Sequence, residues 1–206
     1  MLFTLKNIQY KFETAVFLKE LSLTINNGNH LLVHGKSGSG KSTLINLMTG
    51  LLRTVSGNII FEDKNYNDLT DTDLDVLRSK NFGFIFQRLH LIGHLNVKQN
   101  ISIAINKNNC LCPNELIKDL GLEKLRSKKV SDLSVGEAQR VAIARGVVNN
   151  PKVIFADEPT SALDNFNSRK VMDLILTQTK KTNSTLIVST HDERIKSFFS
   201  KVIELK

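Results

Sequence analysis

The sequence predicts an α/β domain that is layered around a largely parallel sheet. Short apolar runs of β-type residues alternate along the chain with segments whose apolar residues recur at helical spacing. The chain has 206 residues, of which 41% are hydrophobic, and this is enough to bury one substantial core. We therefore expect a single domain over residues 1–206.

The strands of this domain are expected where apolar runs are bounded by turn residues. In chain order these runs are 21–25, 30–35, 58–61, 82–86, 153–157, 185–190 and, as an edge strand, 201–205. Helices are expected at 42–49, after a glycine-rich turn, and at 165–181, where Val171, Leu174 and Ile175 follow helical spacing. The segment 165–181 has the length that a crossover between two parallel strands needs.

The middle of the chain has a different composition. From Leu89 to Arg145 the pattern is mostly helical and loop-like, and Pro113 stands near the start of one expected helix. This change in pattern indicates a helical subdomain, at approximately 88–146, that is inserted into the core.

The charge and the cysteines limit the classes of function. The 28 Lys and Arg residues exceed the 20 Asp and Glu residues and give a net charge of +8, which favours anionic partners. Many lysines stand in Asn/Lys-rich loops without interleaved aromatic residues, which is typical of a solvated face and not of a nucleic-acid groove. Cys110 and Cys112 lack the second pair that a zinc site needs, so we expect ordinary reduced thiols.

The chain shows neither a signal peptide nor a membrane span. Its first residues contain no long apolar segment and no small-residue cleavage site. No apolar run approaches the ~18 residues of a spanning helix. We expect a soluble, intracellular protein that reaches a membrane only through a partner.

The stretch GKSGSGKS, residues 35–42, has the pattern of a loop that binds nucleotide phosphates, and it lies between an expected strand and an expected helix. Glycines let backbone N–H groups approach the phosphates without a Cβ in the way. The Lys41 ammonium would reach the β- and γ-phosphates, and the Ser42 hydroxyl would supply an oxygen to Mg²⁺. The expected nucleotide contacts are Gly35, Ser37, Gly38, Ser39, Gly40, Lys41, Ser42 and Thr43.

The stretch VIFADE, residues 153–158, is a buried-strand pattern that ends in two acids at the carboxyl end of the strand. Adjacent strand residues point to opposite sides, so the two acids must have different tasks. Asp157 is the expected holder of Mg²⁺, and Glu158 is expected to orient and polarise the attacking water. The other interpretation is that these acids cap a helix after a core strand. It is less favoured because a phosphate loop precedes the two acids in the same chain.

The histidines do not form a site by their spacing. His191 directly follows the expected strand 185–190. From the residues alone, a contact with the γ-phosphate and a position without any functional contact are equally open for His191. The other four are expected to be core or surface residues: His30, His34, His90 and His94.

A second polar turn that leads into a helix, DLSVGEAQRVAIAR, occupies residues 132–145. The N-terminus of a helix offers free N–H groups to an anion, so the chain contains two such starts. Read in order with the phosphate loop, VIFADEP, SALD and STH, this stretch gives the chain a close resemblance to the ATP-binding subunit of ABC transporters, over essentially its whole length. Within that family it is similar to the group that includes the lipoprotein-release ATPase LolD, the macrolide-export ATPase domain of MacB, and FtsE.

The resemblance implies a P-loop NTPase core, with a mostly parallel sheet and an antiparallel β subdomain, and an inserted helical subdomain of ABC ATPase type. It implies the cofactors ATP and Mg²⁺, a head-to-tail homodimer that forms on ATP, and integral membrane permease subunits as partners. No direct contact with nucleic acid is expected. The chain would be cytoplasmic and peripheral on the inner face of the cell membrane.

The resemblance also assigns roles to single positions. Ser134 and the Gly136 backbone would complete the γ-phosphate site of the opposite chain. Gln87 would sense Mg²⁺ and the attacking water, and Asp164 would cross the dimer interface. His191 matches the switch histidine at the γ-phosphate.

Members of the family also stack an aromatic residue on adenine shortly before the phosphate loop. Phe12 is the first choice for this contact and Tyr10 the second, with a plain core aromatic as the other interpretation.

The residues leave two questions of function open. An ATPase that drives transport and an FtsE-like switch that moves no cargo share all of these motifs, and a soluble nucleic-acid ABC ATPase is a third, weaker alternative. The apolar segment from Gln87 to Leu95 would either receive a coupling helix of a membrane subunit or simply pack in the core. Leu89, Leu91 and Ile92 fit both interpretations equally.

The expected signature departs from the usual LSGGQ of the family, because it reads LSVGE, with Val135 and Glu137. Ser134 and Gly136 are retained, so function should survive. Glu137 places a second acid near the expected phosphates, and we hypothesise that its charge slows turnover. Glu137→Gln should then raise the ATPase rate, and an unchanged rate of phosphate release would remove this hypothesis.

Overall fold

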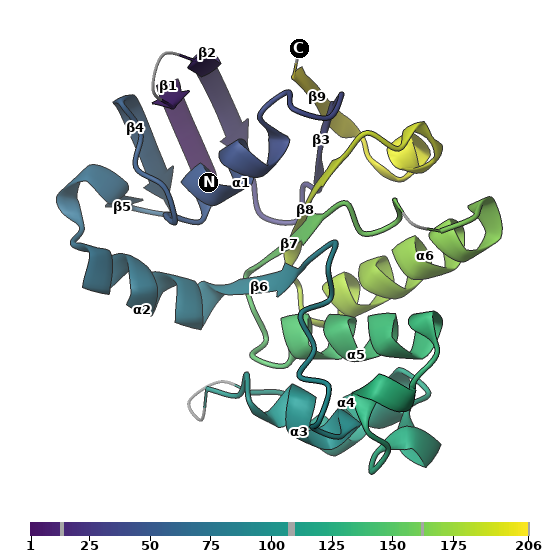
Figure 1. Ribbon diagram of the computed structural model, residues 1–206. Coiled ribbons are helices and arrows are strands. Elements are labelled where there is room, and N and C mark those ends of the chain that lie inside the picture. Colours follow the sequence, from purple (N-terminus) through teal and green to yellow (C-terminus); the bar gives the residue numbers. More distant parts are fainter. Residues whose placement is uncertain (13–14, 107–109, 162, 206) are drawn as a thin grey trace.

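A parallel sheet forms the centre of the molecule. The structure is a computed structural model that describes residues 1–12, 15–106, 110–161 and 163–205 (Figure 1). Within this part of the chain, the five strands of the sheet lie in the order β6 (Phe82–Ile85), β7 (Val153–Asp157), β8 (Thr185–Thr190), β3 (Leu31–Gly35) and β9 (Lys201–Leu205). All of its pairings are parallel, which places the carboxyl ends of these strands at one edge. The parallel sheet and its edge strand at 201–205 agree with the sequence prediction.

A second sheet is antiparallel and lies beside the first (Figure 1). Its strands follow the order β2 (Ala15–Ile25), β1 (Phe3–Phe12), β4 (Ser56–Phe61) and β5 (Lys64–Asn65). β1 was not among the expected strands, and β2 begins well before the expected run 21–25. Register shifts between Leu5 and Ile8 break the strict alternation in β1 that would have revealed it.

Six α-helices and four short 3₁₀ helices complete the described part of the chain. The α-helices are α1 (Lys41–Met48), α2 (Asp71–Asn81), α3 (Val97–Ser102), α4 (Pro113–Asp119), α5 (Val135–Val147) and α6 (Asn165–Lys181). The 3₁₀ helices are η1 (Tyr66–Asp68), η2 (Glu123–Leu125), η3 (Val130–Asp132) and η4 (Glu193–Phe198).

The long helix α6 has the predicted bounds, and Pro113 begins α4 as expected. Helix α2 was not predicted, because only Leu74 and Leu77 give it a buried face. Its start carries a reciprocal cap between Thr70 and Asp73, a signal that the sequence did contain.

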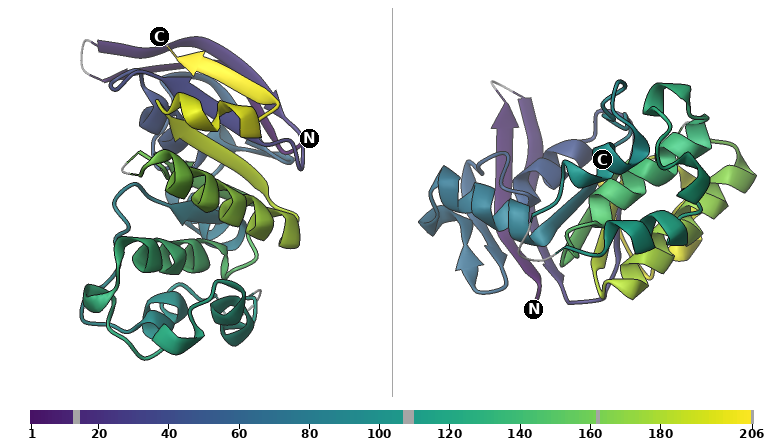
Figure 2. Two further views of the ribbon diagram at one scale, coloured as in Figure 1. Left: turned by 90° about the vertical axis from the view of Figure 1, so that its right-hand side faces the viewer. Right: turned by 90° about the horizontal axis from the view of Figure 1, so that it is seen from below.

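Helices α3, α4 and α5 gather at the end of the molecule opposite the antiparallel sheet (Figure 2). The first two lie within the range 88–146, and α5 runs just past its end. The bounds of a separate helical subdomain stay a prediction.

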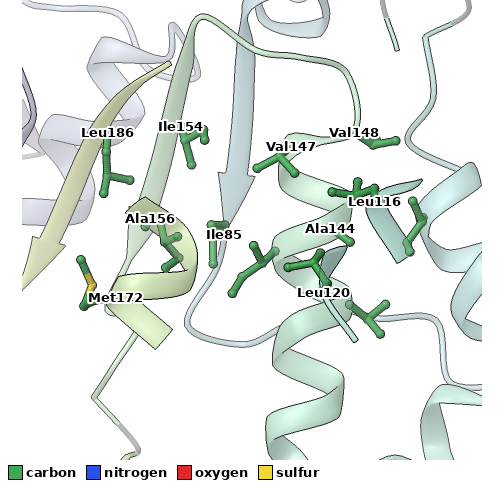
Figure 3. Packing of buried hydrophobic residues seen from close by; sticks show 14 of the residues in the cluster. Ile85, Leu116, Leu120, Ala144, Val147, Val148, Ile154, Ala156, Met172 and Leu186 are labelled. Carbon is green, nitrogen blue, oxygen red and sulfur yellow. The ribbon is translucent and has the colours of Figure 1, made fainter. Parts of the chain in front are cut away.

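Two apolar clusters cover the two faces of the parallel sheet. Alternate residues of β7 separate them, because Val153 and Phe155 face the cluster shared with α1 and the antiparallel sheet, whereas Ile154 and Ala156 face the helices. Figure 3 shows the second cluster, in which side chains of α4, α5 and α6 pack against the strands. The sheet is therefore buried on both faces, as a parallel sheet requires.

Helix α5 and strand β6 approach each other through glycines. A Cβ atom on Gly83 would collide with the carbonyl oxygen of Gly146, and a Cβ atom on Gly146 would lie 2.8 Å from the carbonyl oxygen of Phe84. The two backbones are thus in direct contact, without side chains between them.

This contact predicts a large cost for a single methyl group. Gly83→Ala should lower the free energy of unfolding by about 1–3 kcal/mol or more, because the backbone of α5 cannot shift as a side chain can. Gly93→Ala is the matched control, since nothing lies within 4 Å of a Cβ atom there and its φ is not positive. Equal midpoints of urea unfolding for the two variants would contradict the direct contact.

Candidate active site

The phosphate loop connects β3 to α1, and glycines set its path. Gly38 and Gly40 have φ angles of 83° and 90°, a region that side chains with a Cβ rarely adopt. A Cβ atom on Gly35 would lie 2.5 Å from both the Leu205 carbonyl oxygen and the Ser39 hydroxyl. The loop therefore requires glycine where it turns and where it passes the end of β9.

The Lys41 ammonium braces this loop from the inside. Its side chain is only 6% exposed, and Nζ donates to the carbonyl oxygens of Gly35 at 2.9 Å and Lys36 at 3.0 Å. The Glu158 carboxylate lies 3.5 Å away and supplies an opposite charge. A buried cation is thus fixed beside the loop, ready to face an anionic ligand.

Asp157 lies beside the loop at the end of β7. Its Oδ2 accepts a hydrogen bond from the Ser42 hydroxyl at 3.1 Å, and its Oδ1 accepts one from the Ser189 hydroxyl. A carboxylate and a hydroxyl next to each other are the oxygen ligands that Mg²⁺ prefers.

Glu158 takes a different set of partners, as expected for the neighbouring position. Its Oε2 accepts from the Thr190 hydroxyl at 2.6 Å, and its Oε1 lies 2.8 Å from His191 Nδ1. Glu158 has a φ of 47°, and its N–H donates to the Ser189 carbonyl oxygen at 2.8 Å. The left-handed backbone turns its carboxylate toward His191 and Lys41, where it can polarise a water molecule.

Gln87 joins the site from the segment after β6. Its Nε2 donates to the Ser161 hydroxyl at 3.3 Å, and that hydroxyl donates to the Glu158 carbonyl oxygen at 3.1 Å. The segment after β6 is thereby linked to the segment after Glu158.

A cavity of about 300 Å³ brings most of the predicted residues together. It is lined by Ser37, Gly38, Gly40, Lys41, Ser42, Thr43, Gln87, Asp157, Glu158 and His191. Gly35 and Ser39 belong to the same loop without lining the cavity, and the buried Ser39 hydroxyl has no partner among the described residues. One cation, several hydroxyls and glycine-rich backbone suit a chain of phosphates.

The side chains around the cavity can be compared with the ligands that a magnesium ion needs. No group of three or more His, Cys, Asp and Glu side chains in the described ranges is placed to hold one. Ser42 and Asp157, with Gln87 nearby, could supply only part of a magnesium shell. The other oxygens would come from phosphate and water, which is how Mg²⁺ is commonly bound with nucleotides.

Four predicted residues lie at the starts of two helices and do not line this cavity. Ser134 caps α5: its hydroxyl accepts from the Glu137 N–H at 3.3 Å, and its own N–H donates to the Glu137 carboxylate at 2.8 Å. Gly136 lies exposed in the same first turn. The backbone N–H of Ser134 holds the pKa of Glu137 below its usual value, so the carboxylate carries its charge at neutral pH.

Asp164 caps α6 in the same way. Its carboxylate accepts from the N–H of Asn167 at 2.8 Å and from its side-chain amide at 2.7 Å, and these bonds lower the pKa of Asp164.

The two candidates for the adenine contact belong to β1. The side chain of Phe12 lies outside the described residues. Tyr10, the second choice, is half-buried and packs against the cluster around α1. Both assignments stay predictions.

Several residues of the site were not found from the sequence. The Thr190 hydroxyl donates a hydrogen bond to Glu158, and the Ser189 hydroxyl donates one to Asp157. In the sequence, their position just before His191 is the one sign of these roles. His34, expected to be a core or surface residue, has its Nε2 3.3 Å from the His191 carbonyl oxygen. This contact joins β3 to the turn after β8 and could not be read from spacing.

Comparison with known proteins places the chain in a family. A sequence model described as ABC transporter matches residues 18–161. The lipoprotein-releasing system ATP-binding protein LolD of Wigglesworthia glossinidia brevipalpis is 36% identical, over 98% of this chain and 92% of that protein. The macrolide export ATP-binding/permease protein MacB of Mannheimia succiniciproducens is 39% identical over 94% of this chain, which spans only 31% of MacB.

Solved structures agree with these relatives. A dimeric structure of the bacterial ABC transporter cassette MJ0796 matches with a TM-score of 0.85 and 33% identity, over 99% of this chain and 94% of that one. A dimeric structure of the same cassette in a post-hydrolysis state, bound to ADP and Pi, matches equally well. No helix in the described part of the present chain is both long and apolar enough to cross a membrane. With the phosphate loop and the paired acids in one cavity, these likenesses show that the chain belongs to the ABC transporter family, as an ATP-hydrolysing subunit of the LolD and MacB type.

Proposed function

We propose that two copies of this chain bind MgATP between them, head to tail, and that hydrolysis drives a membrane partner between two conformations. The observation that carries this proposal is the division of the predicted site residues. One cavity gathers the phosphate loop with Asp157 and Glu158, while the capped starts of α5 and α6 stand apart from it. A second copy would bring its Ser134 and Gly136 against the γ-phosphate, and the similar cassette MJ0796 is known in a dimeric form.

Within each cavity the chain's own groups have separate tasks. The Lys41 ammonium binds the β- and γ-phosphates. Ser42, Asp157 and Gln87 would hold Mg²⁺, and that ion would supply positive charge next to the phosphates. Glu158 orients the attacking water, and His191, which lies against it, contacts the γ-phosphate. ATP acts as an interface contact because both chains touch its γ-phosphate, and loss of that phosphate removes the contacts that hold the closed pair.

The membrane partner would dock in a groove along β6. Two adjoining cavities of about 770 and 320 Å³ share Phe82, Phe84, Ala104 and Asn149 in their walls. Phe86 is 39% exposed and stacks on Phe84 with ring centroids 5.6 Å apart. An amphipathic segment could lay its apolar face on these rings.

The apolar residues that follow Gln87 are partly engaged elsewhere. Leu91 packs against the cluster of the helices, and the Asn100 side chain is bonded to both backbone groups of Ile92. For these residues the packing interpretation is favoured. The exposed aromatic Phe86 is the stronger docking residue, and it lies next to Gln87, which reaches the active site.

We propose that the pair of subunits lies on the cytoplasmic face of the cell membrane.

Substitution of Glu158 tests the assignment of the hydrolytic residue. Glu158→Gln should keep nucleotide affinity within about twofold and lower kcat by about 10²–10⁴, since it removes the group that polarises water. Phosphate release and the affinity for a fluorescent ATP analogue measure the two quantities separately.

Lys41→Ala is the contrasting variant. It should weaken nucleotide binding by at least about tenfold, because hydrogen bonds to charged groups contribute about 1.5–3 kcal/mol. Hydrolysis at the unmutated rate by Glu158→Gln, or unchanged affinity in Lys41→Ala, would show that these roles are wrongly assigned.

The membrane partner can be tested by co-purification. Glu158→Gln expressed in the native host should trap the ATP-loaded pair, and mild detergent should extract it with an integral membrane protein that mass spectrometry identifies. Adding Phe86→Asp should reduce that recovery severalfold. Val202→Asp is the matched control, because Val202 is 38% exposed on β9, at the opposite edge of the same sheet.

Recovery of soluble proteins or nucleic acid alone would contradict the membrane partner. Equal recovery with Phe86→Asp and Val202→Asp would contradict the groove. The extracellular part of a recovered partner would distinguish a transporter from a switch that moves no cargo.

A further inference from the structure

The residue directly after His191 is a buried carboxylate with a full set of donors. Asp192 is 8% exposed, and its Oδ2 accepts from the Thr160 hydroxyl at 2.8 Å. The Arg194 guanidinium supplies further donors to both oxygens of this carboxylate. Its Nε donates to Asp192 Oδ1 at 2.7 Å, and its Nη2 donates to Asp192 Oδ2 at 2.8 Å. A buried carboxylate is stable only when it is paired in this way, and the Arg194 side chain lowers the pKa of Asp192.

The same guanidinium also reaches the segment between Glu158 and α6. Its Nη1 donates to the Leu163 carbonyl oxygen at 3.0 Å and to the Asn165 side-chain oxygen at 2.9 Å. These two residues flank Asp164, the residue that caps α6. Arg194 therefore holds the backbone of Leu163 on one side of Asp164 and the side chain of Asn165 on the other.

The other end of this network is the carboxylate of Glu158. The Asp192 N–H donates to the Thr190 hydroxyl at 3.0 Å, and that hydroxyl donates to Glu158 at 2.6 Å. His191 lies between Thr190 and Asp192, with its Nδ1 2.8 Å from Glu158. A continuous series of hydrogen bonds thus runs from Glu158 through Asp192 and Arg194 to the segment around Asp164.

We propose that Arg194 is a positioning residue that couples the hydrolysis site of one chain to its contact with the second chain. The proposal rests on the proposed function, because it uses Asp164 as a residue of the dimer interface. When the second copy displaces Asp164, Leu163 and Asn165 move with it. The planar, rigid fork of Arg194 transmits that movement to Asp192, and hence to His191 and Glu158. Hydrolysis in each chain then depends on the presence of the other.

Lysine is the sharpest replacement for Arg194. It keeps the positive charge that Asp192 requires, but one ammonium cannot hold the carboxylate and the two acceptors beside Asp164 in a fixed plane. Arg194→Gln removes the charge as well. Lys196→Gln is the matched control, since Lys196 stands in the same 3₁₀ helix and its ammonium pairs, among the residues that the structure describes, with Glu193 and Glu204 alone.

The test measures ATPase rate against ATP concentration and, separately, the affinity for a fluorescent ATP analogue, with thermal melting as a check of folding. For the unmutated chain we expect a Hill coefficient above one. Arg194→Lys should keep the affinity within about twofold, lower kcat by about tenfold and bring the Hill coefficient toward one. Thr160→Val should act in the same direction and add little to Arg194→Lys, because both act through Asp192.

Three outcomes would overturn the inference. If Arg194→Lys and Arg194→Gln, both folded, keep the unmutated kcat and Hill coefficient, Arg194 couples nothing and the proposed function stands. If Lys196→Gln loses as much as Arg194→Lys, the effect is one of local stability in η4. If Glu158→Gln forms no ATP-dependent dimer in size-exclusion chromatography, the proposed function fails and the inference fails with it.

Discussion

The parallel register of β3, β8 and β7 is the constraint on which the site depends. Val33 pairs with Ser189, and Ser189 pairs in turn with Asp157, so three distant parts of the chain end at one level of the sheet. The phosphate loop, the two acids and His191 all follow directly from these strand ends. Since side chains alternate between the faces of a strand, a slip of one residue would turn the hydroxyls of β8 away from the acids they hold.

The two adjacent acids show how one strand end can supply two different chemistries. Asp157 keeps strand geometry and meets hydroxyl groups, whereas Glu158 adopts a left-handed backbone and meets His191 and Lys41. The unfavourable conformation of Glu158 is maintained by its N–H bond to β8 and by the Thr190 hydroxyl. Separate partners let one carboxylate serve a metal and the other a water molecule.

Local patterns predicted the parallel strands and the long helix α6, because buried parallel strands are continuously apolar and α6 has a strong helical period. They failed for β1 and α2. Bulges interrupt the alternation of β1, and α2 is polar on most of its surface, so tertiary contacts rather than pattern decide both. The loop residues and acids of the site lie in contiguous motifs and were predictable. His34 and Arg194 were not, since their partners lie far away in sequence and are brought close only by the sheet and the turn after β8.

The close passage of Gly35 beside Leu205 has a consequence for synthesis. β3 pairs with β8 on one side and with β9 on the other, so β3 has neither neighbour until residues 185–190 and 201–205 have been synthesised. The antiparallel sheet can form earlier, because its strands all lie within the first 65 residues. The carbonyl oxygen of Leu205 then lies beside Gly35, at the start of the phosphate loop. The strand that carries the phosphate loop therefore completes its pairing only after residues 201–205 have been made, long after the antiparallel sheet can form.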